Sequence, residues 1–133
     1  MHFVLDACAM IAFLRDEGGA EVVQGRLALE PPVCLAHAVN LCEVFYHFLD
    51  DAGEDAARRA LDDLRAAGLT VREDMDEAFW QQVGRHKIQY RMSLADAFAL
   101  SLADRFGAEL LTSDRGDFEQ VSRSARHRVT FIR

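Results

Sequence analysis

Residues 93–118 of the chain read SLADAFALSLADRFGAELLTSDRGDF. Ser93 is a favoured helix N-cap, and the apolar residues after it predict a buried helix over Leu94–Phe106, which the following glycine ends. Residues Glu109–Thr112 then predict a short buried strand, and Asp114 follows its end closely. A helix followed by a buried strand that leads into an acid is typical of α/β folds.

The rest of the sequence continues this alternation on both sides. Further apolar runs predict strands at His2–Asp6, Val33–Ala36, Leu69–Arg72 and Val129–Ile132. Periodic patterns and start and stop residues predict helices at Cys8–Leu14, from residue 20 to about Leu29, and at His37–Leu49, Glu54–Ala67, Asp76–Gln89 and Phe118–Ser122. We therefore predict an α/β fold, a three-layer α/β/α sandwich around a mainly parallel central sheet.

Length and composition indicate one domain. The 133 residues, half of them hydrophobic, suffice for a single core, and no Pro-, Gly- or Ser-rich linker divides them, so we expect one domain over residues 1–133. No apolar run approaches the roughly 20 residues that span a bilayer. The N-terminus lacks a basic segment and a cleavage site, so we expect a cytoplasmic protein.

Charge and cysteine content narrow the possible functions. The net charge of −7 argues against broad, non-specific affinity for nucleic acids, although a metal ion can invert the charge of an acidic site. Cys8, Cys34 and Cys42 lie in apolar surroundings without metal-ligand spacing. This pattern predicts reduced, buried thiols rather than a disulfide or a zinc site.

Most acidic residues have an ordinary explanation. Acids that flank helices or lie on outward faces are expected to be solvated or to stabilise helix starts: Asp50, Asp51, Glu54, Asp55, Asp62, Asp63, Glu73, Asp74, Asp76 and Glu77. Four other acids lie among apolar neighbours and need a separate account: Asp6, Glu43, Asp96 and Asp114.

Asp6 and Glu43 each admit two interpretations. Asp6 ends a predicted strand and precedes a helix, so it is either a helix N-cap or a ligand. Glu43 shares a narrow polar stripe with Asn40 and His47 on an otherwise apolar helix. Either this stripe faces solvent, or the Glu43 carboxylate is enclosed by apolar residues and needs a metal or a partner such as His47.

Asp96 and Asp114 also have competing interpretations as helix caps. Ser93 and Asp96 resemble a capping box, but that motif prefers Glu or Gln at its third position. We therefore expect Asp96 to point from a buried helix into the interior or into a cleft. Asp117 is better placed than Asp114 to cap the short helix at Phe118, which leaves Asp114 free at the strand end.

The positions of these acids predict a common site. Asp6 and Asp114 follow strands, and ligands of α/β sheets bind beyond the carboxyl ends of the strands. Carboxylates brought together there repel each other unless they take up protons or share a cation. Oxygen-rich sites select Mg²⁺ or Mn²⁺, which activate water and stabilise charge on a phosphoryl oxygen.

Four segments of the chain together resemble the PIN-domain ribonucleases: Val4–Asp6, Asn40–Val44, Ser93–Ala97 and Leu111–Asp114. The similarity extends from Val4 to Phe118, and the most similar subgroup is the VapC-type toxins of bacterial toxin–antitoxin pairs. The resemblance implies an endoribonuclease that cleaves single-stranded regions of structured RNA with Mg²⁺ or Mn²⁺. It further implies a homodimer that is silenced by a small antitoxin protein.

The resemblance also implies roles for the four acids. Asp6, Asp96 and Asp114 would ligate the metal directly or through water. Glu43 would orient the attacking water or complete the metal shell. The sequence departs from many relatives at Cys8, where they carry Ser or Thr, and this leaves a weaker hydrogen-bond donor near Asp6.

Three further residues are candidates for supporting roles. The resemblance implies that Thr112 braces the site by hydrogen bonding and that Asp117 is an auxiliary acid. Arg115 lies next to Asp114 in the sequence and is a candidate for binding an RNA phosphate, or else an ordinary solvent-exposed arginine.

Two alternative functions stay open at this point. The chain could be a non-catalytic PIN-like module that binds RNA or a protein, or a PIN nuclease of RNA processing that has no antitoxin. The cluster of acids argues against the first, because binding of RNA alone gains nothing from negative charge. A short open reading frame just upstream would favour the toxin.

Three other phosphate-handling classes do not fit the sequence. A phosphorelay receiver needs an acid pair at the first strand and a lysine at a strand end, but the only lysine, Lys87, lies in a predicted helix. A phosphatase of the haloacid dehalogenase type needs an Asp two residues after Asp6, where this chain has Cys8. The G-x-x-x-x-G-K motif of nucleotide-binding P-loops is absent.

Overall fold

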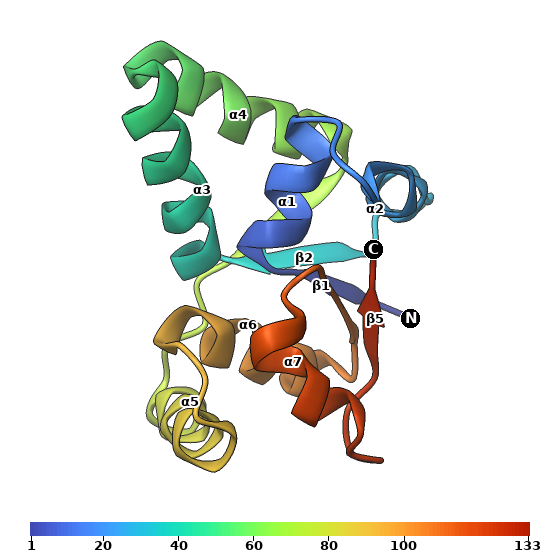
Figure 1. The fold of residues 1–133 in the computed structure, drawn as a ribbon, viewed down its shortest axis with the longest axis vertical. Coiled ribbons are helices and arrows are strands. Elements are labelled where there is room, and N and C mark those ends of the chain that lie inside the picture. The colour runs from blue at the N-terminus through green and yellow to red at the C-terminus, as the bar shows by residue number, and fades with distance from the viewer.

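The computed structural model describes residues 1–133 and contains a five-stranded sheet whose strands all run parallel (Figure 1). In chain order the strands are β1 (Phe3–Leu5), β2 (Cys34–His37), β3 (Leu69–Arg72), β4 (Glu109–Thr112) and β5 (Val129–Phe131). Their order across the sheet is β3-β2-β1-β4-β5, so β1 and β4 are neighbours. The prediction of a mainly parallel sheet is confirmed.

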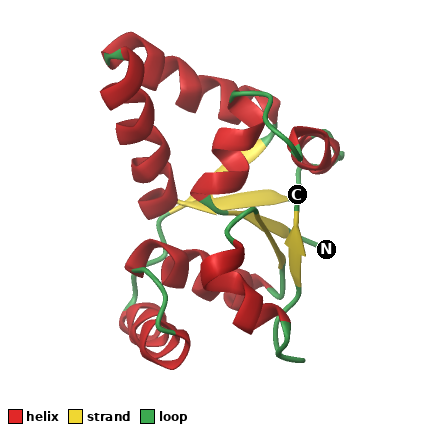
Figure 2. Ribbon diagram, viewed as in Figure 1, coloured by secondary structure: helices red, strands yellow, loops and turns green.

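Helices cover both faces of this sheet. They are α1 (Ala7–Leu14), α2 (Ala20–Leu27), α3 (Ala38–Ala52), α4 (Glu54–Ala67), α5 (Glu77–Tyr90), α6 (Leu94–Phe106) and α7 (Arg115–Ser122). Figure 2 shows the sheet between two helical layers, with α1 to α4 on one side and α5 to α7 on the other. The predicted three-layer sandwich is therefore confirmed. No helix combines the length and the apolar composition that a bilayer crossing requires.

A hydrophobic core lies on each face of the sheet. Leu5 and Leu111 pack into the core shared with α1 to α4, whereas their neighbours Val4 and Leu110 pack into the core shared with α5 to α7. Successive side chains of a strand point to opposite faces, so a strand that is covered on both sides must be apolar throughout. This explains why the predicted strands are short, continuous apolar runs.

At two of the helix starts that differ from the prediction, a residue has another role than expected. Helix α7 begins at Arg115 rather than Phe118, because Asp114 is its N-cap and accepts a hydrogen bond from the backbone N–H of Asp117 at 3.0 Å. The prediction that Asp117 caps this helix is therefore wrong. His37 ends β2 instead of beginning α3, and its Nδ1 caps that helix by accepting from the backbone N–H of Val39 at 3.1 Å.

Two expectations about burial were also wrong. All three cysteines are free thiols, but Cys42 is exposed because it lies off the face that α3 turns to the core. Asp74, expected to be solvated, exposes only 5 % of its side chain and accepts hydrogen bonds from Arg72 at 2.9 Å and Arg105 at 3.0 Å. Two arginines that compensate the carboxylate make this burial possible.

Candidate metal centre

The register between the two neighbouring strands β1 and β4 brings Asp6 beside Thr112. Leu5 pairs with Leu111, so the residues that follow them meet at the carboxyl edge of the sheet. The Thr112 hydroxyl donates a hydrogen bond to the Asp6 carboxylate and accepts one from the backbone N–H of Asp114 at 2.9 Å. Thr112 thus connects the two acids that follow these strands.

Asp6 caps a helix and also lies close to other acidic residues. Its Oδ1 accepts a hydrogen bond from the backbone N–H of Ala9 at 2.9 Å, so Asp6 is the N-cap of α1, one of the two roles that the sequence left open. Burial raises the pKa of Asp6, hydrogen bonds from Thr112 and Ala9 lower it, and the charges of Asp114 and Glu43 raise it further. The resulting pKa is about 7.

The Asp96 side chain does not take part in capping α6, because a residue of another helix makes the hydrogen bond that it would otherwise make. The Ser93 hydroxyl caps α6 by accepting from the backbone N–H of Asp96 at 3.1 Å. The reciprocal bond of a capping box would come from the Asp96 side chain, but here Asp117 of α7 accepts from the backbone N–H of Ser93 at 3.0 Å. The Asp96 carboxylate is therefore available to the neighbouring acids.

Asp96, Asp114 and Asp117 form a compact group. Each offers a carboxylate oxygen, and these oxygens all lie within 4.8 Å of one another. Burial, and then hydrogen bonding with Asp117, raises the pKa of Asp96, whereas the same bond lowers the pKa of Asp117. Without a cation, the close approach of these carboxylates therefore disfavours the ionised form of Asp96.

Glu43 is held toward this group by Asn40 rather than by His47. The Asn40 amide nitrogen donates to Glu43 Oε1 at 3.2 Å and to the backbone carbonyl of Ala95 at 3.1 Å, which ties α3 to the first turn of α6. His47 is exposed. Burial raises the pKa of Glu43, and the bond from Asn40 opposes that rise. We placed Asn40 in the polar stripe but expected His47 to be the partner of Glu43, although the spacing of three residues between Asn40 and Glu43 is a usable signal.

These five acids, called the acidic cluster below, are Asp6, Glu43, Asp96, Asp114 and Asp117. Their donors suit a hard divalent cation, because all are carboxylate oxygens and their mutual repulsion is relieved by positive charge. The buried Oδ1 of Asn40 has no hydrogen-bond partner and offers a further acceptor, for example for a water molecule. A divalent cation could therefore bind at Asp96, Asp114 and Asp117, the compact group within the cluster.

Two residues near the cluster contribute no ligand of their own. Burial, and then the charges of Asp6, Asp114 and Asp96, raises the pKa of Cys8 to about 12, so its thiol stays protonated at neutral pH. Arg115 donates to the backbone carbonyl of Arg133 at 3.1 Å, and its guanidinium carbon lies 4.3 Å from the centre of the Phe131 ring. Its side chain is 58 % exposed and therefore accessible to a ligand. Contact of Arg115 with a phosphate stays a prediction.

The fold and this edge of the sheet define an α/β protein with a carboxylate cluster suited to a divalent metal. The family model of the PIN domain matches residues 3–124, so the chain belongs to the PIN-domain family. Members of this family are typically metal-dependent nucleases. No curated protein matches the chain at a significant level.

Solved structures with the same fold include a toxin and proteins of toxin–antitoxin systems. A toxin–antitoxin complex from Klebsiella pneumoniae has a TM-score of 0.72 at 19% identity, with 98% of this chain and 97% of that chain covered. VapBC2 from Rickettsia felis, bound to a DNA fragment from its promoter, has a TM-score of 0.75 at 14% identity over 98% of both chains. The sarcin-ricin-loop-cleaving toxin VapC20 of Mycobacterium tuberculosis has a TM-score of 0.66 at 19% identity, over 90% of this chain and 94% of that chain.

Proposed function

We propose that this protein is an endoribonuclease that hydrolyses phosphodiester bonds in structured RNA with Mg²⁺ or Mn²⁺. The observation that carries the proposal is the convergence of acids from β1, α3, α6 and the β4–α7 junction on one edge of the sheet. A cluster of carboxylates that must hold protons to persist is costly to a fold, and a cation removes that cost while adding chemistry.

In this proposal each residue has a distinct task. Asp96 and Asp114 of the compact group hold the metal, and Asp6, which lies outside that group, holds it directly or through a water. Thr112 fixes the spacing of Asp6 and Asp114 through its two hydrogen bonds. Glu43 orients the attacking water or completes the metal shell, and burial, which raises its pKa, favours its acting as a proton acceptor. When bound, Mg²⁺ or Mn²⁺ supplies positive charge that stabilises the phosphoryl oxygens and acidifies a water.

Asp117 and Arg115 complete the proposed assignment. Asp117 is an auxiliary acid: it accepts a hydrogen bond from the backbone N–H of Ser93 at the start of α6 and thereby positions Asp96. Arg115 is partly exposed and next to Asp114, so its guanidinium is available to a phosphate of the bound RNA.

We further propose that the protein is the toxin of a toxin–antitoxin pair, that it acts in the cytoplasm as a homodimer, and that a small antitoxin blocks it. The support is the family and the likeness in fold to proteins that were crystallised as toxin–antitoxin complexes. Induced expression should stop growth, and co-expression of a short neighbouring reading frame should restore it. A chain with no effect on growth, whose RNA cleavage no neighbouring product inhibits, would instead be a nuclease of RNA processing.

The nuclease itself is tested with purified protein, freed of any co-purified partner, on a mixture of transfer and ribosomal RNA. Cleavage should require Mg²⁺ or Mn²⁺ and stop with EDTA. It should be lost in Asp96→Asn and Asp114→Asn, which remove a ligand charge while keeping the side-chain shape. Asp62→Asn, a change of the same kind on the exposed surface of α4, should leave cleavage unchanged.

Two results would contradict the proposed activity. Cleavage that persists in Asp96→Asn at the rate of Asp62→Asn would show that a contaminating enzyme or another site is responsible. Absence of cleavage, together with no heat of Mg²⁺ or Mn²⁺ binding in calorimetry, would favour a non-catalytic binding module.

A further inference from the structure

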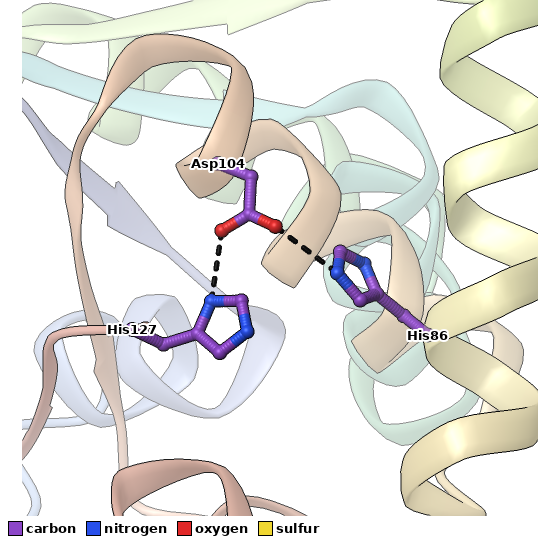
Figure 3. A group of neighbouring side chains, drawn as sticks. All are labelled: His86, Asp104 and His127. Atoms are coloured by element: carbon purple, nitrogen blue, oxygen red, sulfur yellow. Dashed lines mark hydrogen bonds and ion pairs between the residues drawn. The ribbon is translucent and has the colours of Figure 1, made fainter. Parts of the chain in front are cut away.

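A second cluster of metal-ligand side chains lies away from the acidic cluster. It consists of His86 on α5, Asp104 on α6 and His127 in the segment before β5. Figure 3 shows Asp104 between the two imidazoles. His86 Nε2 lies 3.0 Å from Asp104 Oδ2, and His127 Nδ1 lies 2.8 Å from Asp104 Oδ1. The side chains of both histidines are nearly buried, whereas that of Asp104 is one-third exposed.

The spacing of these atoms is close to that of a metal site. One nitrogen from each histidine and one oxygen from Asp104 all lie within 4.8 Å of one another. Two ligands of a tetrahedral zinc ion, each about 2.0–2.1 Å from the metal, are roughly 3.3 Å apart. Small side-chain rotations therefore suffice to place all three ligand atoms around one ion.

The His86 ring is held in the orientation that such a site needs. Its Nδ1 lies 2.8 Å from the hydroxyl of Ser101, a buried residue one turn before Asp104 on α6. With a metal bound, Nδ1 donates to this hydroxyl, and the lone pair of Nε2 serves the ion in place of its present contacts with Asp104 and, at 3.0 Å, with the amide nitrogen of Gln82. A hydrogen bond to the far nitrogen of the imidazole is the usual support of a histidine ligand in metal sites. Ser101 provides such a support here.

Asp104 is charged and lies where a cation is favoured. Burial raises its pKa, but hydrogen bonds with His127 and His86 outweigh burial and lower the pKa to about 2. The residue lies in the last turn of α6, at the negative end of the helix dipole. A carboxylate at this position is stabilised by nearby positive charge, which a bound metal ion supplies.

Solvent reaches the cluster from one side. A pocket of about 260 Å³ is lined by Asp104 and His127, together with Arg126 and Arg128. Arg128 donates to the backbone carbonyl of Gly107 at 2.8 Å, so its side chain is anchored at the end of α6. The pocket leaves room for a water molecule as the fourth ligand.

We propose that His86, Asp104 and His127 form a second metal site, which takes a divalent transition metal such as Zn²⁺ rather than Mg²⁺. Two imidazoles and one carboxylate are a ligand set of zinc sites, and nitrogen ligands disfavour Mg²⁺. The bound ion joins α5, α6 and the segment before β5. It therefore stabilises the layer that carries Asp96 without taking part in phosphoryl chemistry.

The test is Zn²⁺ titration of the untagged full chain by calorimetry. To prevent metal binding at the acidic cluster, the starting protein carries Asp96→Asn and Asp114→Asn. This protein should bind one Zn²⁺ per chain and gain thermal stability. Adding His127→Gln should weaken binding by more than about 100-fold, because loss of an outer-shell partner alone costs roughly 10–100-fold. Ser101→Ala should weaken it within that lower range.

Controls separate this site from adventitious binding. His47→Gln changes an exposed histidine on α3 and should leave Zn²⁺ affinity unaltered. In the wild-type chain, Zn²⁺ should shift the imidazole nitrogen resonances of His86 and His127 but not those of His47. This measurement does not depend on whether a variant folds. Equal Zn²⁺ affinity with and without His127→Gln, or unchanged resonances of His86 and His127, would overturn the proposal.

Discussion

The hydroxyl of the single residue Thr112 holds the two acids at the strand ends in place, since it donates a hydrogen bond to Asp6 and accepts one from the backbone N–H of Asp114. Thr112→Val keeps the shape of the side chain and removes both bonds. We expect RNA cleavage to fall by about 10–100-fold, as for other outer-shell partners of metal ligands. Stability should fall by about 1–3 kcal/mol, because a buried partner group is left unsatisfied.

The matched control for this substitution is Thr70→Val in β3. Thr70 is exposed and makes no side-chain hydrogen bond, so the same chemical change should leave cleavage and stability nearly unaltered. The rate of RNA cleavage and the free energy of unfolding in urea, measured for both variants, test this prediction. Full activity in Thr112→Val would show that the acids hold their positions without it.

Asp96 offers a second residue-scale prediction, because activity and stability should move in opposite directions. Burial and neighbouring carboxylates raise the pKa of Asp96, so its ionised form is unfavourable without metal. In EDTA we therefore expect Asp96→Asn to have an unfolding temperature equal to or above that of wild type, while its metal-dependent cleavage is lost. A marked drop in the unfolding temperature would instead make Asp96 a structural residue.

At the scale of elements, the helix interiors follow from local patterns, whereas the helix ends do so only where the capping residue is unambiguous. The apolar periodicity predicts α6 with both of its ends, because Ser93 and Gly107 are strong local signals. The start of α7 was predicted three residues late, because Asp114 and Asp117 are both acceptable caps. The choice depends on a contact between Asp117 and Ser93, which are 24 residues apart, and no local rule contains it.

The junction between α4 and β3 gives an element-scale prediction. Gly68 has a φ of +119°, and a Cβ atom there would lie 2.6 Å from the carbonyl oxygen of Leu27. Gly68→Ala should therefore destabilise the protein by about 1–3 kcal/mol through strain and this clash. Gly25, in the interior of α2, has open space around its Cα. Gly25→Ala should stabilise by about 0.5–1 kcal/mol, since alanine favours helices.

Urea unfolding of the two glycine variants measures both effects on one scale. Opposite signs of the change in free energy of unfolding are the expected result. No loss of stability in Gly68→Ala would mean that the approach of the α4–β3 junction to Leu27 has no energetic consequence. The contrast also tests whether α2 packs as described.

At the scale of the whole molecule, the order of elements predicts the edge of the sheet at which the acids gather. Strands that alternate with helices form a parallel sheet, and its carboxyl edge then collects Asp6 and Asp114. The same reasoning could not find the group of His86, Asp104 and His127. These residues come from three separate elements, and none ends a strand. Packing of α5 against α6 brings His86 to Asp104, and the segment before β5 adds His127.

The last prediction concerns the stability of the whole protein with pH and Mg²⁺. The pKa of Asp6 is raised from 3.8 to about 7, so the metal-free folded state holds a proton that the unfolded chain releases. The contribution of Asp6 to stability is therefore full below about pH 4. It is lost as pH rises toward about 7, at up to about 1.4 kcal/mol per pH unit.

Mg²⁺ binds the ionised carboxylate, so its stabilising effect should have the opposite dependence on pH. We expect the rise in unfolding temperature caused by Mg²⁺ to be small near about pH 6, where the metal must displace a proton, and larger near about pH 8. Asp6→Asn should reduce this difference, whereas Asp62→Asn should preserve it. An equal Mg²⁺ effect at the two pH values would show that the metal does not bind at the carboxylates whose ionisation the fold opposes.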